Sequence, residues 1–169
     1  QLVGHGFRLD QAPRLLGTRA DEFTGTLVGG DEPRNPSIAY FQQNGRRSCQ
    51  GLKAIWALED VGPGDGGLVM VQASHKSNVE TPQDLLTGAD HMGLVRQPSL
   101  QAGDLLLVAE STLQGMRPWK GSAKRLLIYC YAGRAMIQSN GPGPGGEGDA
   151  PPEWASANPA HKAVLYRPG

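Results

Sequence analysis

Residues 52–71 read LKAIWALEDVGPGDGGLVMV, and this stretch decides the fold class. Its first part alternates as a strand does, so that one face carries Leu52, Ala54, Trp56 and Leu58. A turn over residues 62–67 follows, because the four glycines and one proline there favour neither helix nor strand. Residues 68–71 then form a short apolar strand. Strands joined by a turn, without an intervening helix, predict a sheet that is not built from parallel α/β units.

The segment before this stretch predicts a β-hairpin. Ser37–Gln43 alternates as a strand and runs into Asn44-Gly45, a dipeptide favoured in two-residue hairpin turns because both residues tolerate positive φ. Leu52–Leu58 is the predicted return strand of this hairpin. A further candidate strand lies earlier in the chain, at Thr24–Val28.

The segment after this stretch predicts one short helix and more strands. Thr81 is placed to cap a helical turn that runs through Leu86, with Pro82 at the first helical position. Strands are predicted at Leu94–Leu100, at Leu105–Val108 as a buried run, and at Leu126–Tyr131. Pro98 places the first of these at a sheet edge. Short strands separated by Gly, Pro and Asp predict a mainly β sandwich or jelly roll with short helical segments.

Composition limits the classes of partner. The chain has 16 Lys plus Arg and 16 Asp plus Glu, so its net charge gives no electrostatic reason to expect nucleic acid or an anionic membrane as partner. No apolar run approaches the roughly 20 residues that span a bilayer. The sequence therefore predicts a soluble, cytoplasmic protein, with its oligomeric state left open.

The 169 residues fit one domain followed by a tail. Residues 1–140 are the predicted jelly-roll domain, and Gln1 in place of an initiating Met is consistent with an N-terminally truncated domain. Residues 141–153, rich in Gly and Pro, predict a flexible linker. Residues 154–169 predict a tail with a short helix, capped by Asn158.

Six elements, in their order and spacing, resemble the phytanoyl-CoA dioxygenase family over residues 38–133. They are Trp56-Ala57-Leu58-Glu59-Asp60-Val61, Gly64-Asp65-Gly66-Gly67-Leu68, Ser74-His75-Lys76-Ser77-Asn78, Ala102-Gly103-Asp104-Leu105-Leu106, Gln114-Gly115 with Pro118-Trp119, and Lys124-Arg125-Leu126-Leu127-Ile128-Tyr129. The resemblance implies a double-stranded β-helix, cupin-like, and oxidation of a small organic substrate by Fe(II), 2-oxoglutarate and O₂. Two His and one carboxylate hold the iron in such proteins and leave positions open for the cosubstrate.

The sequence departs from the family at the metal ligands. The position of the distal His carries Gln114, and the positions of the His-x-Asp element carry Gln42 and Asn44. No His-x-Asp occurs anywhere in the chain, so no metal ligand and no catalytic residue is assigned. The resemblance does imply a cosubstrate residue, Arg125, whose guanidinium would pair with the far carboxylate of 2-oxoglutarate. The alternative for Arg125 is a surface residue at the start of a strand.

The remaining histidines and both cysteines have structural interpretations. No ligand role is predicted for the four histidines, His5, His75, His91 and His161. Cys49 and Cys130 fall in strand-like segments, outside any C-x-x-C pair, and are predicted as buried thiols or as a disulfide.

Three functions stay open at the level of sequence. The first is an Fe(II)/2-oxoglutarate dioxygenase, which the resemblance implies. The second is a catalytically inactive barrel retained for ligand binding or interaction, which the altered ligand positions favour. The third is a metal-free cupin-type binding module without oxygenase ancestry, against which the ordered family elements argue.

Overall fold

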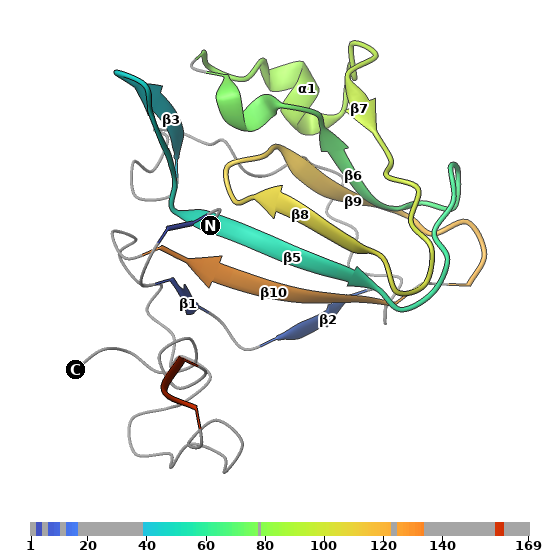
Figure 1. The fold of residues 1–169 in the computed structure, drawn as a ribbon. Coiled ribbons are helices and arrows are strands. Elements are labelled where there is room, and N and C mark those ends of the chain that lie inside the picture. The colour runs from blue at the N-terminus through green and yellow to red at the C-terminus, as the bar shows by residue number, and fades with distance from the viewer. Residues whose placement is uncertain are drawn as a thin grey trace.

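The computed structural model describes residues 3–4, 7–10, 13–16, 39–77, 79–122, 125–133 and 158–160. Within these residues the chain forms mainly short antiparallel strands, with one five-residue α-helix, α1 (Gln83–Thr87), and one 3₁₀ turn, η2 (Ser74–Lys76). The strands assemble into a larger sheet, a smaller sheet and a separate hairpin (Figure 1).

The larger sheet has five strands in the order β1-β10-β5-β8, with β2 also paired to β10. These strands are β1 (Arg8–Leu9), β2 (Arg14–Leu16), β5 (Gly51–Ala57), β8 (Leu105–Ala109) and β10 (Leu126–Ala132). The seven-residue strand β5 lies between β10 and β8, so its side chains are flanked on both sides. We call this five-stranded sheet the major sheet.

The smaller sheet has three strands in the order β7-β6-β9. They are β6 (Gly67–Val71), β7 (Val95–Arg96) and β9 (Gln114–Arg117). We call it the minor sheet. From β5 onward the chain passes back and forth between the sheets, since β5, β8 and β10 belong to the major sheet and the intervening strands to the minor one.

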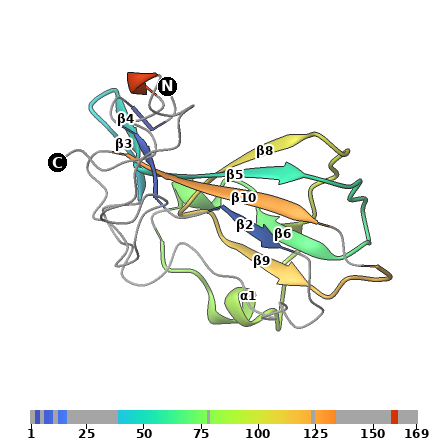
Figure 2. The ribbon, with the colours of Figure 1, turned by 90° about the horizontal axis from the view of Figure 1, so that it is seen from below.

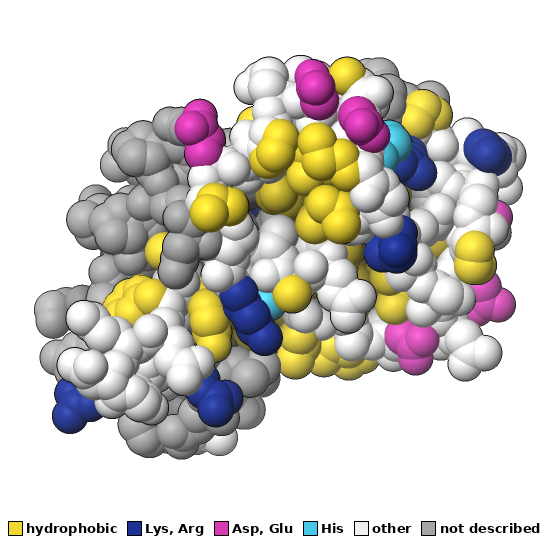
Figure 3. All heavy atoms as spheres, turned by 90° about the horizontal axis from the view of Figure 1, so that it is seen from above, with side chains coloured by type: hydrophobic (Ala, Val, Ile, Leu, Met, Phe, Trp, Pro, Cys, Tyr) yellow, Lys and Arg dark blue, Asp and Glu magenta, His cyan; other side chains and the backbone are white. Residues whose placement is uncertain are grey.

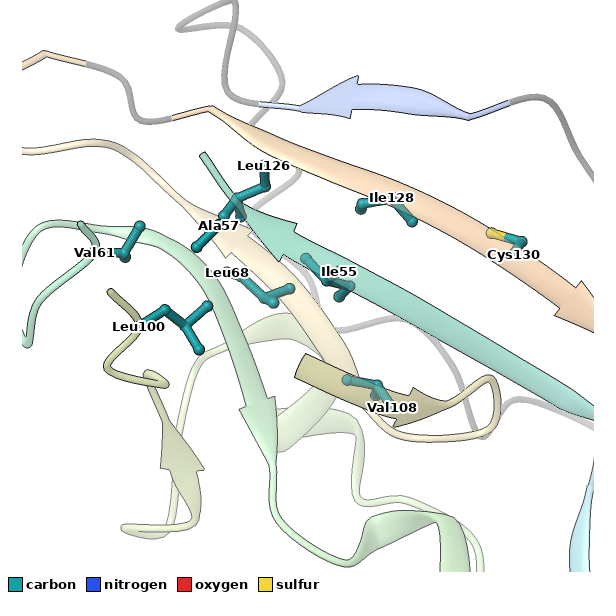
Figure 4. Packing of buried hydrophobic residues seen from close by; sticks show 9 residues of the cluster. All are labelled: Ile55, Ala57, Val61, Leu68, Leu100, Val108, Leu126, Ile128 and Cys130. Atoms are coloured by element: carbon teal, nitrogen blue, oxygen red, sulfur yellow. The ribbon is translucent and has the colours of Figure 1, made fainter. Parts of the chain in front are cut away.

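The two sheets enclose the main core. Figure 2 shows β5 and β10 of the major sheet over β6 and β9 of the minor sheet. Apolar side chains from both sheets pack between them, among them Ile55, Leu68 and Leu126. Figure 4 shows most of these side chains near Leu126 and Ala57, with Cys130 towards the other end of β10. The outer face of the minor sheet forms a second core with α1, through Leu85.

The predicted hairpin turn is confirmed, but its return strand is not. Asn44 and Gly45 adopt positive φ of 50° and 74° between β3 (Tyr40–Gln43) and β4 (Arg46–Cys49). Gln43 pairs directly with Arg46, because a two-residue turn pairs the residues that flank it. The predicted return strand, Leu52–Leu58, is instead β5 and pairs with β10 and β8.

Two further predictions are corrected. The helix begins one residue later than predicted: Pro82, and not Thr81, is the N-cap residue, and its carbonyl accepts the first hydrogen bonds. The run at Leu105–Val108 is not buried throughout, because alternate side chains of β8 point to the outer face of the major sheet. Leu105 and Leu107 are 43% and 46% exposed, whereas Val108 is buried.

Other predictions are confirmed within the described residues. The strands over residues 68–71 and 126–131 match β6 and β10. The predicted strand Leu94–Leu100 is reduced to the two-residue strand β7, which does lie at an edge of the minor sheet. The side chain of Asn158 accepts a hydrogen bond from the backbone N–H of Ala160, as a cap does. The candidate strand Thr24–Val28 and the linker 141–153 lie outside the described residues. None of the helices in the described part of the chain is long and apolar enough to cross a membrane.

Candidate functional site

One row of inward-facing residues crosses the major sheet near the start of β5. Cys130 on β10 lies opposite Lys53 on β5, and Lys53 lies opposite Val108 on β8. The backbone N–H of Asp10 donates to the carbonyl of Cys130 at 2.8 Å, which brings Asp10 to the same row. Directly opposed residues of an antiparallel pair point to the same face of a sheet. Since Cys130 and Val108 belong to the main core, the row faces the interior.

The row carries two ion pairs at the edge of the core. Lys53 Nζ lies 3.0 Å from Glu110 Oε1, and these side chains are 16% and 26% exposed. Arg8 Nη2 lies 3.8 Å from Asp10 Oδ1, with side chains that are 11% and 3% exposed. Charged side chains this poorly exposed are uncommon unless they are paired. The interior is therefore polar at this end and apolar at the Leu126 end; we call the former the polar end.

The minor sheet contributes Gln114 to the polar end. Gln114 is the first residue of β9, is 6% exposed, and lies two residues before Met116, which packs against the main core. Alternate residues of a strand share a face, so Gln114 also points between the sheets. Only residues 111–113 separate Gln114 from Glu110 along the chain, so Gln114 lies at the same end of the interior as Glu110.

Ser74 fixes the connection that leads into β9. Its hydroxyl donates to the carbonyl of Val71 and accepts from the N–H of Leu113, both at 2.8 Å, and it is buried. A buried hydroxyl that both donates and accepts ties the two segments together. The Ser of the Ser-His-Lys element therefore ties the end of β6 to Leu113, the residue that precedes β9.

The sequence-predicted ligand positions differ in their burial. Gln42 and Asn44 are exposed on the β3–β4 hairpin, whereas Gln114 is buried at the start of β9. The assignment of these three as altered ligand positions stays a prediction. No three His, Cys, Asp or Glu side chains of the described residues are grouped so as to hold a metal ion. The described residues thus do not fit the iron site that the resemblance implies.

Arg125 lies just before β10, at the opposite end of the strand from Cys130. Its side chain is 56% exposed, and its Nε lies 3.4 Å from Glu59 Oε2. By alternation along β10, Arg125 shares the outward face with Leu127 and Tyr129, which line a surface pocket of about 470 Å³. Its role as a cosubstrate residue stays a prediction, and the structure places it apart from Gln114.

The described histidines have local contacts. His75 lies in η2, and its ring meets that of Tyr40 edge-on, with centroids 5.1 Å apart. Burial, and then the charge of Lys76, lower the pKa of His75 below its ordinary value, so the neutral form is favoured. His91 lies in the turn between α1 and β7. His5 and His161 lie outside the described residues.

Both described cysteines are free thiols, which answers the disulfide question left open by the sequence. Burial raises the pKa of Cys130, and the carboxylate of Glu110 raises it further. Burial likewise raises the pKa of Cys49. Both side chains therefore stay protonated at neutral pH and are poor nucleophiles.

We expect the raised pKa values and the burial of the two thiols to slow their reaction with thiol reagents. A thiol reagent such as DTNB should modify the native protein slowly at pH 7, with Cys130 slower than the half-buried Cys49. The rates should rise with pH through a midpoint above that of a free cysteine, because the folded pKa values are raised. Rapid modification of Cys130 in the native state, compared with a urea-unfolded control, would contradict the buried placement.

The charged row of the major sheet was not predicted from the sequence. Lys53 stands in a strand that is apolar on both faces, so alternation alone did not show which face is buried. The missed signal was the alternation of charge with apolar residues in Arg8-Leu9-Asp10 and in the strand around Lys53. Figure 3 shows a different face, which carries α1; acidic and basic side chains are scattered there rather than gathered in one patch.

Comparison with solved structures defines the class of fold. The arrangement of a major and a minor antiparallel sheet, mainly β with one short helix, matches the double-stranded β-helix fold. The apo structure of HygX from Streptomyces hygroscopicus has 25% sequence identity and a TM-score of 0.56, over 78% of this chain and 62% of HygX. The predicted fold class is thus confirmed. No family model matches the chain, and no curated protein matches it.

Two other structures of HygX are similar to this chain and contain ligands. With nickel and 2-oxoglutarate bound, HygX has 26% identity and a TM-score of 0.54, over 75% of this chain and 58% of HygX. With nickel, 2-oxoglutarate and hygromycin B bound, HygX has 23% identity and a TM-score of 0.51, over 75% of this chain and 59% of HygX. The chain therefore spans less than two thirds of the length of HygX.

Proposed function

We propose that this chain is a phytanoyl-CoA dioxygenase-like protein of the Fe(II)/2-oxoglutarate oxygenase superfamily, and that its barrel binds a small organic molecule. Hydroxylation of that molecule is the activity that this relationship predicts. The observation that carries the proposal is the similarity to HygX with nickel and 2-oxoglutarate bound, at 26% identity. The order of the family elements in the sequence supports it independently.

The chain's own residues suit an amphipathic small molecule. The polar end of the interior offers an ammonium group, carboxylates and the Gln114 amide. The apolar end, around Ile55 and Leu126, is packed and excludes water. Because the described residues do not fit an iron site, no reaction step is assigned to iron here.

A second candidate function is metal-independent binding by the same barrel, as a catalytically inactive relative. The observation that favours it is the buried, inward-facing Gln114, at the position that the resemblance aligns with the distal His of the family. A carboxamide is a weaker ligand than imidazole for a divalent first-row metal. In this function the barrel would bind an organic acid without oxidising it.

Anaerobic titration separates the two functions. Under the first, Fe(II) with 2-oxoglutarate should give a visible charge-transfer band, and isothermal titration should show metal-dependent binding of 2-oxoglutarate. Under the second, 2-oxoglutarate should bind equally with Fe(II) or EDTA, without a band. A band overturns the inactive barrel, and its absence in a folded, 2-oxoglutarate-binding protein overturns the oxygenase. A Gln114→His variant is the matched control: a band in this variant alone would identify Gln114 as the altered ligand.

A further inference from the structure

The strand β8 forms an edge of the major sheet and carries no charged side chain. It reads Leu-Leu-Leu-Val-Ala over residues 105–109, and β5 is the only described strand that pairs with it. In Figure 1 it is the uppermost strand of that sheet. A free edge offers a row of N–H and C=O groups to another strand, and proteins usually protect such edges with a charge, a proline or a short strand. β8 contains neither a charge nor a proline.

The other edge strands of the two sheets have such protection. Each contains an arginine: Arg8 in β1, Arg14 in β2, Arg96 in β7 and Arg117 in β9. These strands are also shorter, with two to four residues against the five of β8. Among the described edges of the two sheets, β8 is therefore the one at which a further strand can pair without burying a charge.

The hydrogen bonds between β5 and β8 show which backbone groups the free edge presents. The N–H of Glu110 donates to the carbonyl of Gly51 at 2.9 Å. In an antiparallel pair, residues that bond the partner alternate with residues whose N–H and C=O point the other way. Leu106 and Val108 therefore bond β5, whereas the backbone groups of Leu105, Leu107 and Ala109 point to the free edge.

We propose that β8 pairs antiparallel with β8 of a second copy of this chain, about a twofold axis at Leu107. Leu107 then lies opposite the same residue of the second copy, and Leu105 lies opposite Ala109. All three residues present their backbone groups to the edge, so each pair exchanges two hydrogen bonds. A large side chain faces a small one in the outer pairs, which makes the strand its own complement. The two major sheets become one continuous sheet.

The pairing also covers apolar surface that water now reaches. Leu105 and Leu107 are 43% and 46% exposed on the outer face of β8. In the dimer, the leucines of the two copies lie side by side across the new strand pair, because directly opposed residues share a face. Exposed apolar side chains on an unprotected edge are the usual mark of a pairing site.

The size of the interface sets its strength. Five paired residues bury less than the about 800 Å² per partner of a standard protein interface. Interfaces of standard size dissociate at micromolar concentrations or below, so this smaller one is expected to dissociate on the order of 10–100 µM. The protein is then a monomer at low micromolar concentration and a dimer when concentrated.

Asp104 provides a test of the register. In the twofold arrangement it lies opposite Glu110 of the second copy, and like charges directly opposite each other destabilise a strand pair. Lys53, which lies 3.0 Å from Glu110, offsets part of this repulsion. Asp104 Oδ2 accepts a hydrogen bond from the N–H of Gln101 at 2.8 Å, which an asparagine oxygen can also accept. Asp104→Asn should therefore tighten the dimer about two-fold or more.

Sedimentation velocity measures the dimer, with the chain studied from about 2 to about 200 µM, on both sides of the expected dissociation constant. Leu107→Lys places two ammonium groups together at the twofold axis and should weaken association about ten-fold or more. Leu15→Lys is the matched control, because Leu15 lies in β2, away from β8, and is 42% exposed. It should leave association unchanged. Asp84→Asn, an exposed aspartate of α1, is the control for Asp104→Asn.

A wild type that stays monomeric up to about 200 µM overturns the proposal, as does a Leu107→Lys variant that associates as wild type does. An equal loss in Leu15→Lys also overturns it, because the contact would then involve the outer face and not the edge. Asp104→Asn without tighter association overturns the register about Leu107. Thermal unfolding shows whether each variant is folded, and Leu105→Lys replaces Leu107→Lys if the latter does not fold.

Discussion

Gly66→Ala should lower the free energy of unfolding by about 2–5 kcal/mol, from overpacking plus left-handed backbone strain. Gly66 has φ of +91°, and a Cβ there would lie 2.8 Å from the Cα of Trp119 and closer still to the carbonyl oxygen of Pro118. Those atoms are backbone, so they cannot move aside as a flexible side chain would. The added Cβ should push the turn before β6 away from the segment after β9. Urea denaturation, followed by circular dichroism, measures the change in the free energy of unfolding.

Gly64 provides the matched control. It has the same φ of +91°, but a Cβ there would meet no atom within 4 Å. Gly64→Ala should therefore show only the backbone strain, about 1–2 kcal/mol. Equal losses of stability in the two variants would show that Gly66 does not lie against residues 118–119.

Leu126→Ala should lower the free energy of unfolding by about 2–5 kcal/mol. Leu126 is fully buried, at 0% exposure, and pairs with Ala57 on one side and Leu16 on the other. Its small neighbour Ala57 cannot fill the resulting cavity. The midpoint of urea unfolding should fall while the slope is unchanged, as expected for loss of stability alone.

Leu107→Ala removes the same number of atoms from the outward face of β8. Leu107 is 46% exposed, so its truncation should change the free energy of unfolding by about 0.5 kcal/mol or less. A comparable loss in Leu107→Ala would mean that the outer face of the major sheet is covered in the folded protein.

The turns of this fold could be predicted from sequence more reliably than the strand pairing. Asn44-Gly45 favours a two-residue hairpin turn because these two residues tolerate the positive φ angles that the turn requires. This preference depends on the two residues alone. The strand partner of Leu52–Ala57 is β10, which lies 69 residues further along the chain at the Ala57–Leu126 pair and 79 residues at the Leu52–Tyr131 pair. No local signal encodes that contact. The prediction therefore placed the right turn next to the wrong return strand.

The candidate site was predicted only in part, for a similar reason. Gln114 was singled out, and it does face the interior. Lys53 and Asp10 were not, because their inward direction follows from pairing with Cys130 rather than from their own neighbours in sequence. Arg125 was assigned from the family resemblance, whereas in the structure its side chain is exposed and pairs with Glu59.

The pairing of β1 with β10 has a consequence for how the protein forms. Arg8 lies opposite Ala132, so the first described strand completes its hydrogen bonds only with the last strand of the major sheet. During synthesis, β1 therefore has no pairing partner until nearly the whole barrel has been made. Such non-local contacts carry a high loop-closure entropy and give slow folding, on the millisecond-to-second scale for β-rich domains. Closure at β1 is expected to be a late event in folding, and it is the same event that brings Arg8 and Asp10 to the polar end.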